Sequence, residues 1–458
     1  MHGDFTLDPL KYRDDVTRVL AQQGRVQLDS DANEQTETIL RFLRALGRDI
    51  IGPHGGVGTS FQLSKAGSPP GLHISRGEYY VDGIRCTIPP GGDIWEIVDD
   101  PAPATADLRK PVPLKKLPNF VPPPDANKQL LYYLDVYERH VSSSEDDSLR
   151  DVALLGADTS SRALLTWRLR TLVIDDDFRK LVTRAKNYGW PFREIDDWYA
   201  ALNLRLRTGV RMRAKAAGSE STNPCIISPE ARYRGFENRL FRVEIHDPGI
   251  PPLPGQTTPE RKPTFKWSQD NGSIVYPVRK VSGKIIKLAS LGRDARTQIC
   301  VNDWVEIVDD DVVINPQYHP LLQVVDVNPA EMSVELNALP DENVGTDPNK
   351  HPILRRWASN LIEVELRAAP KDAWTELADG VQIEFSQLPR PYAGLRPGDY
   401  WLIPTRTADG SVAWPQVNGV ARDLPPNGID HHYAPIAMMD GPQATPMDLR
   451  LKYPYLAS

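Results

Sequence analysis

The apolar positions at the start of the chain predict a short helix followed by a short strand. Residues 12–23 place apolar side chains at helical spacing, and Gly24 follows them where helices commonly end. Val26 and Leu28 then alternate with polar residues over 25–29, which is typical of one face of a strand. We therefore expect a helix and a strand before residue 30.

A second, longer helix is predicted up to Gly52. Ser30 or Asp31 is suited to cap its first turn, because a short polar side chain accepts hydrogen bonds from the free N–H groups there. Two short helices bury little surface alone, so an apolar stripe on this helix must pack on the β-rich remainder or on another chain. The stripe has spacings of four, three and four residues and consists of Ile39, Leu43, Leu46 and Ile50.

Beyond residue 60 the helical period gives way to short alternating runs that are typical of strands. Two turn signals, Asp82-Gly83 and Asn271-Gly272, each predict a tight hairpin between the runs on either side. These patterns predict a mainly β protein with α elements (α+β), built from several small β-sandwich or barrel units.

Two stretches refine this picture. The amphipathic stretch 175–220 predicts a helical insertion, and its basic run 205–215 is expected to be a solvated helix face. Regularly spaced strands after residue 285, among them 312–314, predict a small barrel-like domain. The chain is thus divided into a helical docking segment, a small β unit, a Pro-rich connector, a β domain with the insertion, the barrel-like domain and a C-terminal β/loop region: 1–60, 61–100, 101–124, 125–284, 285–345 and 346–458.

The prolines are not evenly spread, and two stretches together hold 14 of the 42. The chain has 42 prolines in 458 residues, and this excess disfavours a mostly helical protein because an interior proline removes a helix hydrogen bond. Residues 101–124 and 248–263 are the richest stretches and are expected to be stiff, polyproline-like connectors or arms.

The charge and the cysteine content limit which binding partners and which cellular compartment we expect. The chain has 54 basic and 61 acidic residues, so its net charge of −7 gives no support for nucleic-acid binding. Its three cysteines are far apart, which fits a reducing cytoplasm and neither a disulfide framework nor a zinc site. We expect synthesis in the cytoplasm without a signal peptide, and no transmembrane segment.

Candidate chemistry is sparse. The adjacent pair His431-His432 is a possible metal or base site, but no second metal-ligand motif accompanies it, so packed loop histidines are the alternative. No nucleophile motif is present, and we expect no catalytic residue and no cofactor. Five tryptophans in predicted strands are expected to be core anchors, or else a platform for carbohydrate: Trp167, Trp267, Trp304, Trp401 and Trp414.

One set of segments, spread over nearly the whole chain, has a recognisable pattern: 2–6, 22–34, 234–246, 265–273, 398–404 and 431–435. Together they resemble an uncharacterised bacterial family encoded beside baseplate and spike genes of contractile, phage-tail-like injection systems. The segment 22–34 is also similar to the N-terminal part of certain phage tail and fibre proteins.

The resemblance implies a non-enzymatic structural component of such a particle, located at or near the baseplate. It would act through protein–protein contacts with other tail or baseplate proteins, in copies that follow the particle's symmetry, inside the cell or in the released particle. On this hypothesis an edge strand and the helix stripe form the docking interface: Val26, Leu28, Ile39, Leu43, Leu46 and Ile50. Two alternatives remain open: a cargo effector or hydrolase carrying a metal near His431 and His432, and a fibre-like glycan-binding module.

Overall fold

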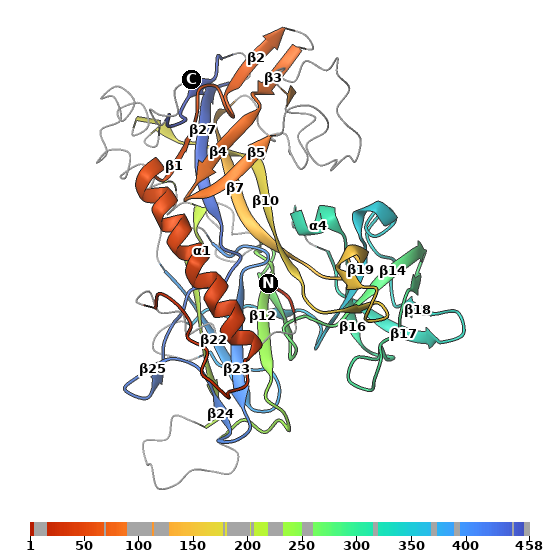
Figure 1. Ribbon diagram of the computed structural model, residues 1–458. Helices are drawn as coiled ribbons and strands as arrows, with labels where there is room; N and C mark the ends of the chain where they lie inside the picture. Colours follow the sequence, from red (N-terminus) through yellow and green to blue (C-terminus); the bar gives the residue numbers. More distant parts are fainter. Residues whose placement is uncertain are drawn as a thin grey trace. The chain divides into compact units, whose positions relative to one another are not determined.

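The computed structural model shows a β-rich protein, as predicted, and one long helix among the residues that it describes (Figure 1). The chain forms two compact units, each assembled from segments far apart in sequence. Unit 1 comprises Met1–Lys11, Arg139–Leu164 and Leu204–Ile429, and unit 2 comprises Tyr12–Glu138, Leu165–Asn203 and Asp430–Ser458. The structure describes residues 1–3, 16–67, 70–88, 112–113, 128–176, 179–180, 202, 206–218, 232–249, 260–314, 319–367, 373–388, 394–441 and 444–452.

Unit 2 holds the long helix α1 (Asp29–Ile51) and most of three sheets. Apolar side chains from these sheets form one core around Phe61, Tyr79 and Trp167. The sheets have the strand orders β1 (His54–Gly56), β4 (Gly77–Val81), β5 (Ile84–Ile88); β2 (Leu63–Gly67), β3 (Pro70–Ile74), β6 (Val112–Pro113); and β10 (Arg162–Val173), β7 (Gln129–Val141), β27 (His432–Asp440), β28 (Met447–Asp448).

The described part of unit 1 contains two further sheets, a closed barrel, two small hairpins and short helices. The sheets are β20 (Ile362–Glu363), β13 (Thr264–Ser268), β12 (Leu240–Asp247), β23 (Tyr400–Arg406), β24 (Ser411–Val412), and β11 (Val210–Ala216), β22 (Val381–Gln387), β21 (Thr375–Glu376). The barrel is β14 (Val275–Ser282), β15 (Ile285–Leu288), β18 (Ser333–Leu336), β17 (Leu322–Asn328), β16 (Trp304–Val308), β19 (Ile353–Trp357). One hairpin pairs β8 (Arg150–Asp151) with β9 (Ala157–Asp158), and the other pairs β25 (Gln416–Val417) with β26 (Val420–Ala421). The short helices are η2 (Asp147–Leu149), α4 (Asp310–Ile314) and η3 (Pro348–Lys350).

The residues of unit 1 that the structure describes form two apolar cores. One lies between the two sheets and contains Phe241, Phe265, Phe385 and Trp401. The other fills the barrel, whose strands run from 275 to 357 and so extend beyond the predicted 285–345 at both ends.

The hairpin predicted at Asp82-Gly83 is confirmed. β4 pairs antiparallel with β5 from Gly77 to Val81, and both turn residues have positive φ angles, 48° and 78°. Aspartate and glycine tolerate this left-handed conformation, which matches the twist of a two-residue hairpin.

The predictions for the first 30 residues were wrong wherever the structure describes them. Residues 16–28 contain neither the predicted helix nor the predicted strand at 25–29. The backbone N–H of Val19 instead donates to Gln35 Oε1 of α1 at 2.8 Å, so the donor is satisfied outside a helix. A short helix without a packed face is marginal in water, which explains why the local spacing did not decide the structure here.

The basic run predicted as a helix face is a buried strand at its C-terminal end. β11 pairs with β22 along its whole length, and its apolar side chains enter the core between the two sheets. Arg213 donates to Glu384 at 2.6 Å, and Lys215 lies 4.0 Å from the centre of the Trp374 ring. Strand pairing and these partners outweigh the local helical pattern.

Two other local predictions were wrong. Residues 312–314 belong to the short helix α4, in which Asp309 accepts a hydrogen bond from the Val312 N–H at 3.2 Å, as an N-terminal cap does. His432 begins strand β27 instead of lying in a loop.

Asn271-Gly272 adopts the predicted left-handed turn, with φ angles of 50° and 62°, but does not close a hairpin. β13 pairs with β12 and β20, whereas β14 pairs with β15 and β19 of the barrel. The turn thus carries the chain from a sheet to the barrel. The Asn271 side chain donates to the carbonyls of Met1 and Gly3, which gives the turn residue a second, structural role.

Several predicted features lie wholly or mainly outside the described residues. These are most of the connector 101–124, the centre of the loop 248–263 and most of the helical insertion 175–220. Within the described part of the chain, no helix is both long and apolar enough to cross a membrane.

Candidate functional site: the outward apolar face of α1

Helix α1 begins after an irregular stretch and is capped from within its own first turn. The predicted N-cap at Ser30 or Asp31 is wrong, because both residues lie inside the helix and Leu28 occupies the N-cap position. Asp31 instead accepts a hydrogen bond from the backbone N–H of Leu28 at 3.2 Å. Asp29 and Asp31 also place negative charge at the positive end of the helix dipole. The helix ends at Gly52, as predicted, where a φ of 97° departs from helical geometry.

The side of α1 that packs on the rest of unit 2 is polar. Arg44 donates to Glu138 at 2.6 Å, and Arg48 lies 3.7 Å from Asp82 of the β4–β5 turn. The one buried residue of α1 is Thr38. Charged side chains therefore hold the helix, whereas a surface helix ordinarily packs through its apolar stripe.

Two glycines allow this polar side to approach the β4–β5 turn closely. A Cβ atom on Gly47 would lie 3.1 Å from the Cα atom of Gly83, and a Cβ atom on Gly83 would lie 2.8 Å from the Cα atom of Arg44. Because Gly83 also has a positive φ, both the contact and the turn require glycine there. The close approach fixes which side of α1 faces the unit.

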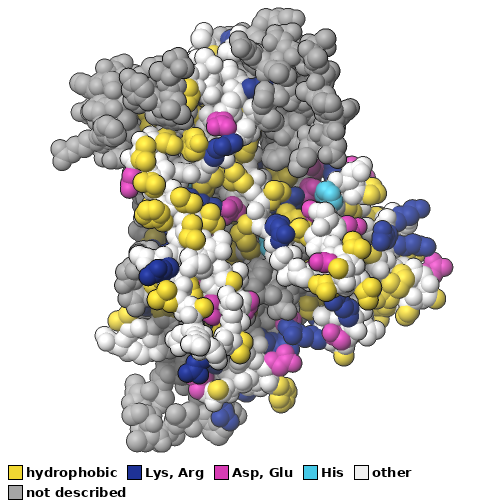
Figure 2. Space-filling view, in the orientation of Figure 1, with side chains coloured by type: hydrophobic (Ala, Val, Ile, Leu, Met, Phe, Trp, Pro, Cys, Tyr) yellow, Lys and Arg dark blue, Asp and Glu magenta, His cyan; other side chains and the backbone are white. Residues whose placement is uncertain are grey.

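The apolar side of α1 consequently faces outward. Figure 2 shows hydrophobic side chains gathered over the helix. The exposed fraction reaches 67% for Phe42 and 74% for Ile50, although contact of a large apolar side chain with water is energetically unfavourable. The exposed apolar residues of the helix, here called the α1 face, are Ile39, Leu40, Phe42, Leu43, Leu46 and Ile50.

The α1 face contains all four residues of the predicted stripe. It also contains Leu40 and Phe42, which the sequence analysis did not include because they lie beside the strict four-three-four spacing. Leu40 and Phe42 lie within one helical turn of Leu43 and widen the face, and that spacing is a signal visible in the sequence.

Val26 and Leu28 precede the helix and are exposed as well, at 86% and 54%. They do not form a strand within unit 2. The backbone of Leu28 is extended, with φ −93° and ψ 152°. The structure therefore places both side chains in solvent next to the start of α1 but leaves their predicted strand pairing with a neighbour as a prediction.

Unit 1 contains a buried ionic network that spans strands of a sheet and of the barrel. Lys266 of β13 donates to Glu306 of β16 at 2.7 and 2.8 Å and lies 3.3 Å from Glu244 of β12. Trp357 of β19 donates to Glu306 at 2.9 Å, and Arg242 contacts Glu244 at 2.6 Å. The network thus links the five-stranded sheet to the barrel.

The charges in this network stabilise one another. Burial would raise the pKa of Glu244, but Arg242, Lys266 and His2 together hold it well below its ordinary value. Burial would likewise raise the pKa of Glu306, and Lys266 and His246 hold it lower. Each carboxylate already has cationic partners within the protein, so the arrangement is that of a structural ion network.

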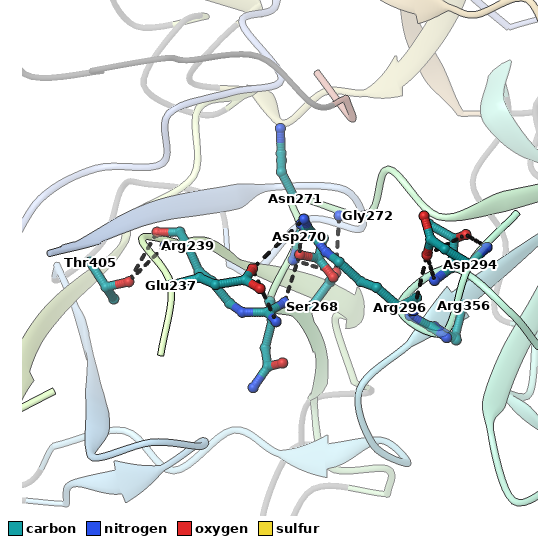
Figure 3. A network of polar contacts seen from close by, with 12 residues as sticks. Glu237, Arg239, Ser268, Asp270, Asn271, Gly272, Asp294, Arg296, Arg356 and Thr405 are labelled. Carbon is teal, nitrogen blue, oxygen red and sulfur yellow. Dashed lines mark hydrogen bonds and ion pairs between the residues drawn. The ribbon is translucent and has the colours of Figure 1, made fainter. Parts of the chain in front are cut away.

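A second polar network in unit 1 surrounds Asp270 (Figure 3). Asp270 accepts hydrogen bonds from Arg239 at 2.9 Å and from Arg296 at 2.5 Å. Arg356 donates in turn to the carbonyl of Arg296 at 2.6 Å, and Ser268 Oγ accepts from the N–H groups of Asp270 and Gly272. These contacts join the end of β13 to a loop of the barrel. The arginine N–H groups in this network therefore donate to structural partners, as in the first network.

The structure gives each residue of the His431-His432 pair its own carboxylate. His431 Nδ1 lies 2.5 Å from Asp135, and His432 Nδ1 lies 3.0 Å from Asp82. Arg168 also donates to Asp135, at 2.9 and 3.0 Å. Among the described residues, no three His, Cys, Asp or Glu side chains gather in a way that could hold a metal ion.

The tryptophans considered as a carbohydrate platform are mostly inside the protein. Trp304 is half-buried, and the other four are buried. The Trp401 and Trp414 ring N–H groups donate to the backbone carbonyls of Leu424 and Arg422. These five residues therefore do not form an open aromatic face.

The fold and this surface define a β-rich protein of two units that keeps one face of its long helix apolar and exposed. The chain belongs to the family of unknown function DUF6519, whose model matches residues 1–187 and 196–444. Comparisons with curated proteins and with solved structures gave no match.

Proposed function

We propose that this protein is a non-enzymatic structural component of a contractile, phage-tail-like injection system, located at or near the baseplate. It acts by binding other tail or baseplate proteins, in a copy number set by the particle's symmetry. Membership in such a particle is supported by the resemblance of segments such as 22–34 and 234–246 to proteins encoded with such systems. The outward α1 face supports the mode of action and is the observation that carries the proposal.

The inverted orientation of α1 favours docking over a role in the protein's own core. A contiguous exposed apolar surface commonly marks a site of interaction. The α1 face extends over eleven residue steps from Ile39 to Ile50, roughly 16 Å at 1.5 Å per residue. Burial of a large apolar side chain contributes about 1.5–3 kcal/mol, so six such residues supply enough free energy for a stable contact.

The polar side of α1 makes this docking geometrically simple. Because Arg44, Arg48 and Gly47 already hold the helix on unit 2, a partner that covers the opposite side need not displace any of these contacts. We infer that the helix is presented preformed, which lowers the entropic cost of binding. Val26 and Leu28 extend the interface beyond the helix start, by side-chain contact or by the predicted edge strand.

The arrangement of the β units fits the same role. We propose an α+β protein in which the sheets β20-β13-β12-β23-β24 and β11-β22-β21 form a small sandwich beside the barrel. The buried ionic networks hold these units together without using their charged groups for chemistry. A sheet and a barrel linked in this way within unit 1 are suited to transmit force between neighbours in a particle that contracts.

The test is the incorporation of full-length protein into particles. In a deletion strain, the wild-type chain should restore particles that contain it in a fixed number of copies. Leu43→Asp combined with Ile50→Asp should abolish incorporation and leave a folded protein with an unchanged melting temperature. Val417→Asp combined with Val420→Asp, at exposed positions of the β25–β26 hairpin, is the matched control and should incorporate normally.

Three outcomes contradict the proposal. Particles that lack the wild-type chain, or a deletion strain whose particles assemble and fire normally, would exclude a required structural role. Normal incorporation of the double α1 variant would exclude the α1 face as the docking surface.

A further inference from the structure

The β8–β9 hairpin of unit 1 presents apolar side chains at its tip. Val152 and Leu155 are 91% and 98% exposed, and Leu154 between them is 53% exposed. Exposure of three aliphatic residues within four positions, two of them almost fully exposed, is unusual because each loses the free energy of burial. The hairpin tip, defined here as residues 152–155, is separate in sequence and in unit from the α1 face.

The tip is held in one conformation by hydrogen bonds to its backbone groups. Asp151 Oδ1 accepts hydrogen bonds from the N–H groups of Ala153 at 2.7 Å and of Leu154 at 3.2 Å. The N–H of Gly156 donates to the Asp151 carbonyl at 2.9 Å, and Arg150 donates to the Gly156 carbonyl at 3.2 Å. These bonds make the tip a preformed projection, so little conformational entropy is lost if a partner binds it.

Leu155 is a costly residue at its position. Its φ is 59°, in the left-handed region where a residue with a Cβ atom costs roughly 1–2 kcal/mol and where glycine or asparagine is favoured. The side chain is almost fully exposed, so packing within the chain does not offset this cost. A leucine that neither the turn nor the core requires points to a contact outside the chain.

The surroundings of the tip are acidic. Segment 142–158 contains five acidic residues and one basic residue, Arg150. Arg150 donates hydrogen bonds to the Asp147 carboxylate, the Gly156 carbonyl and the Ser143 carbonyl, at 3.1 to 3.2 Å. Arg139 lies 3.5 Å from Glu145, and Arg293 lies 3.9 Å from Asp158. Asp146 and Asp151 therefore leave a small net negative charge at the base of the apolar tip.

We propose that Val152, Leu154 and Leu155 form a plug that inserts into an apolar pocket of a partner protein with Lys and Arg side chains on its rim. The acidic base complements such a rim, whereas it is repelled by an anionic lipid surface and by the same tip of a second copy. The tip also lacks the Trp and Tyr residues that anchor proteins at membrane interfaces. The proposal goes beyond the proposed function, because it requires a partner protein but no particular particle.

The first experiment locates the partner. A photo-crosslinking amino acid is placed at Leu154 of the full chain, and at Val417 in a control, in the cells that naturally make the protein. The Leu154 derivative should give one protein adduct that the Val417 derivative lacks. The crosslinked peptide should map to an apolar pocket flanked by at least two Lys or Arg residues.

The second experiment measures the purified pair by calorimetry. Val152→Ser combined with Leu155→Asn should weaken binding about tenfold or more, since two buried aliphatic groups are lost. Leu155→Asn alone should leave the melting temperature unchanged or raise it, because asparagine tolerates the left-handed backbone. A purely structural role for Leu155 predicts the opposite change in stability. Val417→Ser should leave the affinity unaltered.

Four results overturn the plug. Two come from crosslinking: no protein adduct at Leu154, or an adduct with a second copy of this chain. The third is that the protein floats with phosphatidylcholine–phosphatidylglycerol vesicles and that Leu155→Asn abolishes this flotation, and the fourth is an unchanged affinity of the tip variant. Each is distinguishable from failure of the proposed function, because the α1 variants leave the tip intact and the tip variants leave α1 intact.

Discussion

Gly47 of α1 faces Gly83 of the β4–β5 turn so closely that a Cβ atom on Gly47 would lie 3.1 Å from the Cα atom of Gly83. This contact, together with the Arg44–Glu138 and Arg48–Asp82 pairs, turns the polar side of the helix towards unit 2. The outward direction of the α1 face follows from it.

Replacement of Gly83 by Ala should destabilise unit 2. The added Cβ atom would overlap the backbone of Arg44, and φ is 78°. Gly419→Ala is the matched control, because Gly419 has a φ of 79° and no atom within 4 Å of the added Cβ. Chemical denaturation should show a loss for Gly83→Ala about 1–3 kcal/mol larger than for the control. Equal losses would mean that α1 does not pack on this turn.

Neighbouring residues on opposite sides of α1 should respond differently to substitution. Arg44→Ala removes a 2.6 Å ion pair and should lower the free energy of unfolding by about 1 kcal/mol. Leu43→Asp changes a side chain that is 53% exposed and should stay within about 0.5 kcal/mol of wild type. If Leu43→Asp proves the more damaging of the two, Leu43 belongs to the core of the folded chain.

Removal of Lys266 should be strongly destabilising. Lys266→Met leaves Glu306 buried without its lysine partner, which costs on the order of 3–5 kcal/mol. Lys287→Met is the control: Lys287 pairs with Glu331 at 3.0 Å but is half-exposed, so its loss should cost less than about 1 kcal/mol. Adding Glu306→Gln to Lys266→Met should recover part of the stability. Denaturant titration of the four proteins, wild type included, tests all three statements.

The buried carboxyl of Asp399 should make stability depend on pH. Burial raises its pKa from 3.8 to about 7, and Oδ2 has no hydrogen-bond partner among the described residues. The folded protein therefore keeps a proton that the unfolded chain loses between about pH 4 and 7. Its contribution to stability is complete below about pH 4 and is lost as the pH rises through 7.

Asp399→Asn removes this buried charge. The variant should unfold like wild type at pH 4 and gain up to about 4 kcal/mol over it above pH 8, since one pKa unit corresponds to about 1.4 kcal/mol. Asp409→Asn, at an exposed carboxyl whose pKa is lowered by hydrogen bonds from Ser411, should show no such gain. Melting curves at both pH values decide the matter, and an Asp399→Asn difference that does not change with pH would contradict the raised pKa.

Much of the secondary structure is encoded locally. The β-rich class follows from the short alternating runs and the proline content, and the β4–β5 hairpin follows from Asp82-Gly83. The four-three-four spacing identified the stripe of α1, because helical period is a property of the sequence itself. The basic run ending in β11 was misread because its pattern suits both a helix and a strand, and only its pairing with β22 decides between them.

The sequence alone determined that α1 has an apolar side, and that this side contains Ile39, Leu43, Leu46 and Ile50. Only the tertiary structure decided that this side faces outward. The usual expectation is the reverse, since apolar stripes ordinarily face a core. Here the close approach of Gly47 to Gly83 and two ion pairs of the polar side fix the orientation. Those contacts join residues far apart in the chain, so no local pattern contains them.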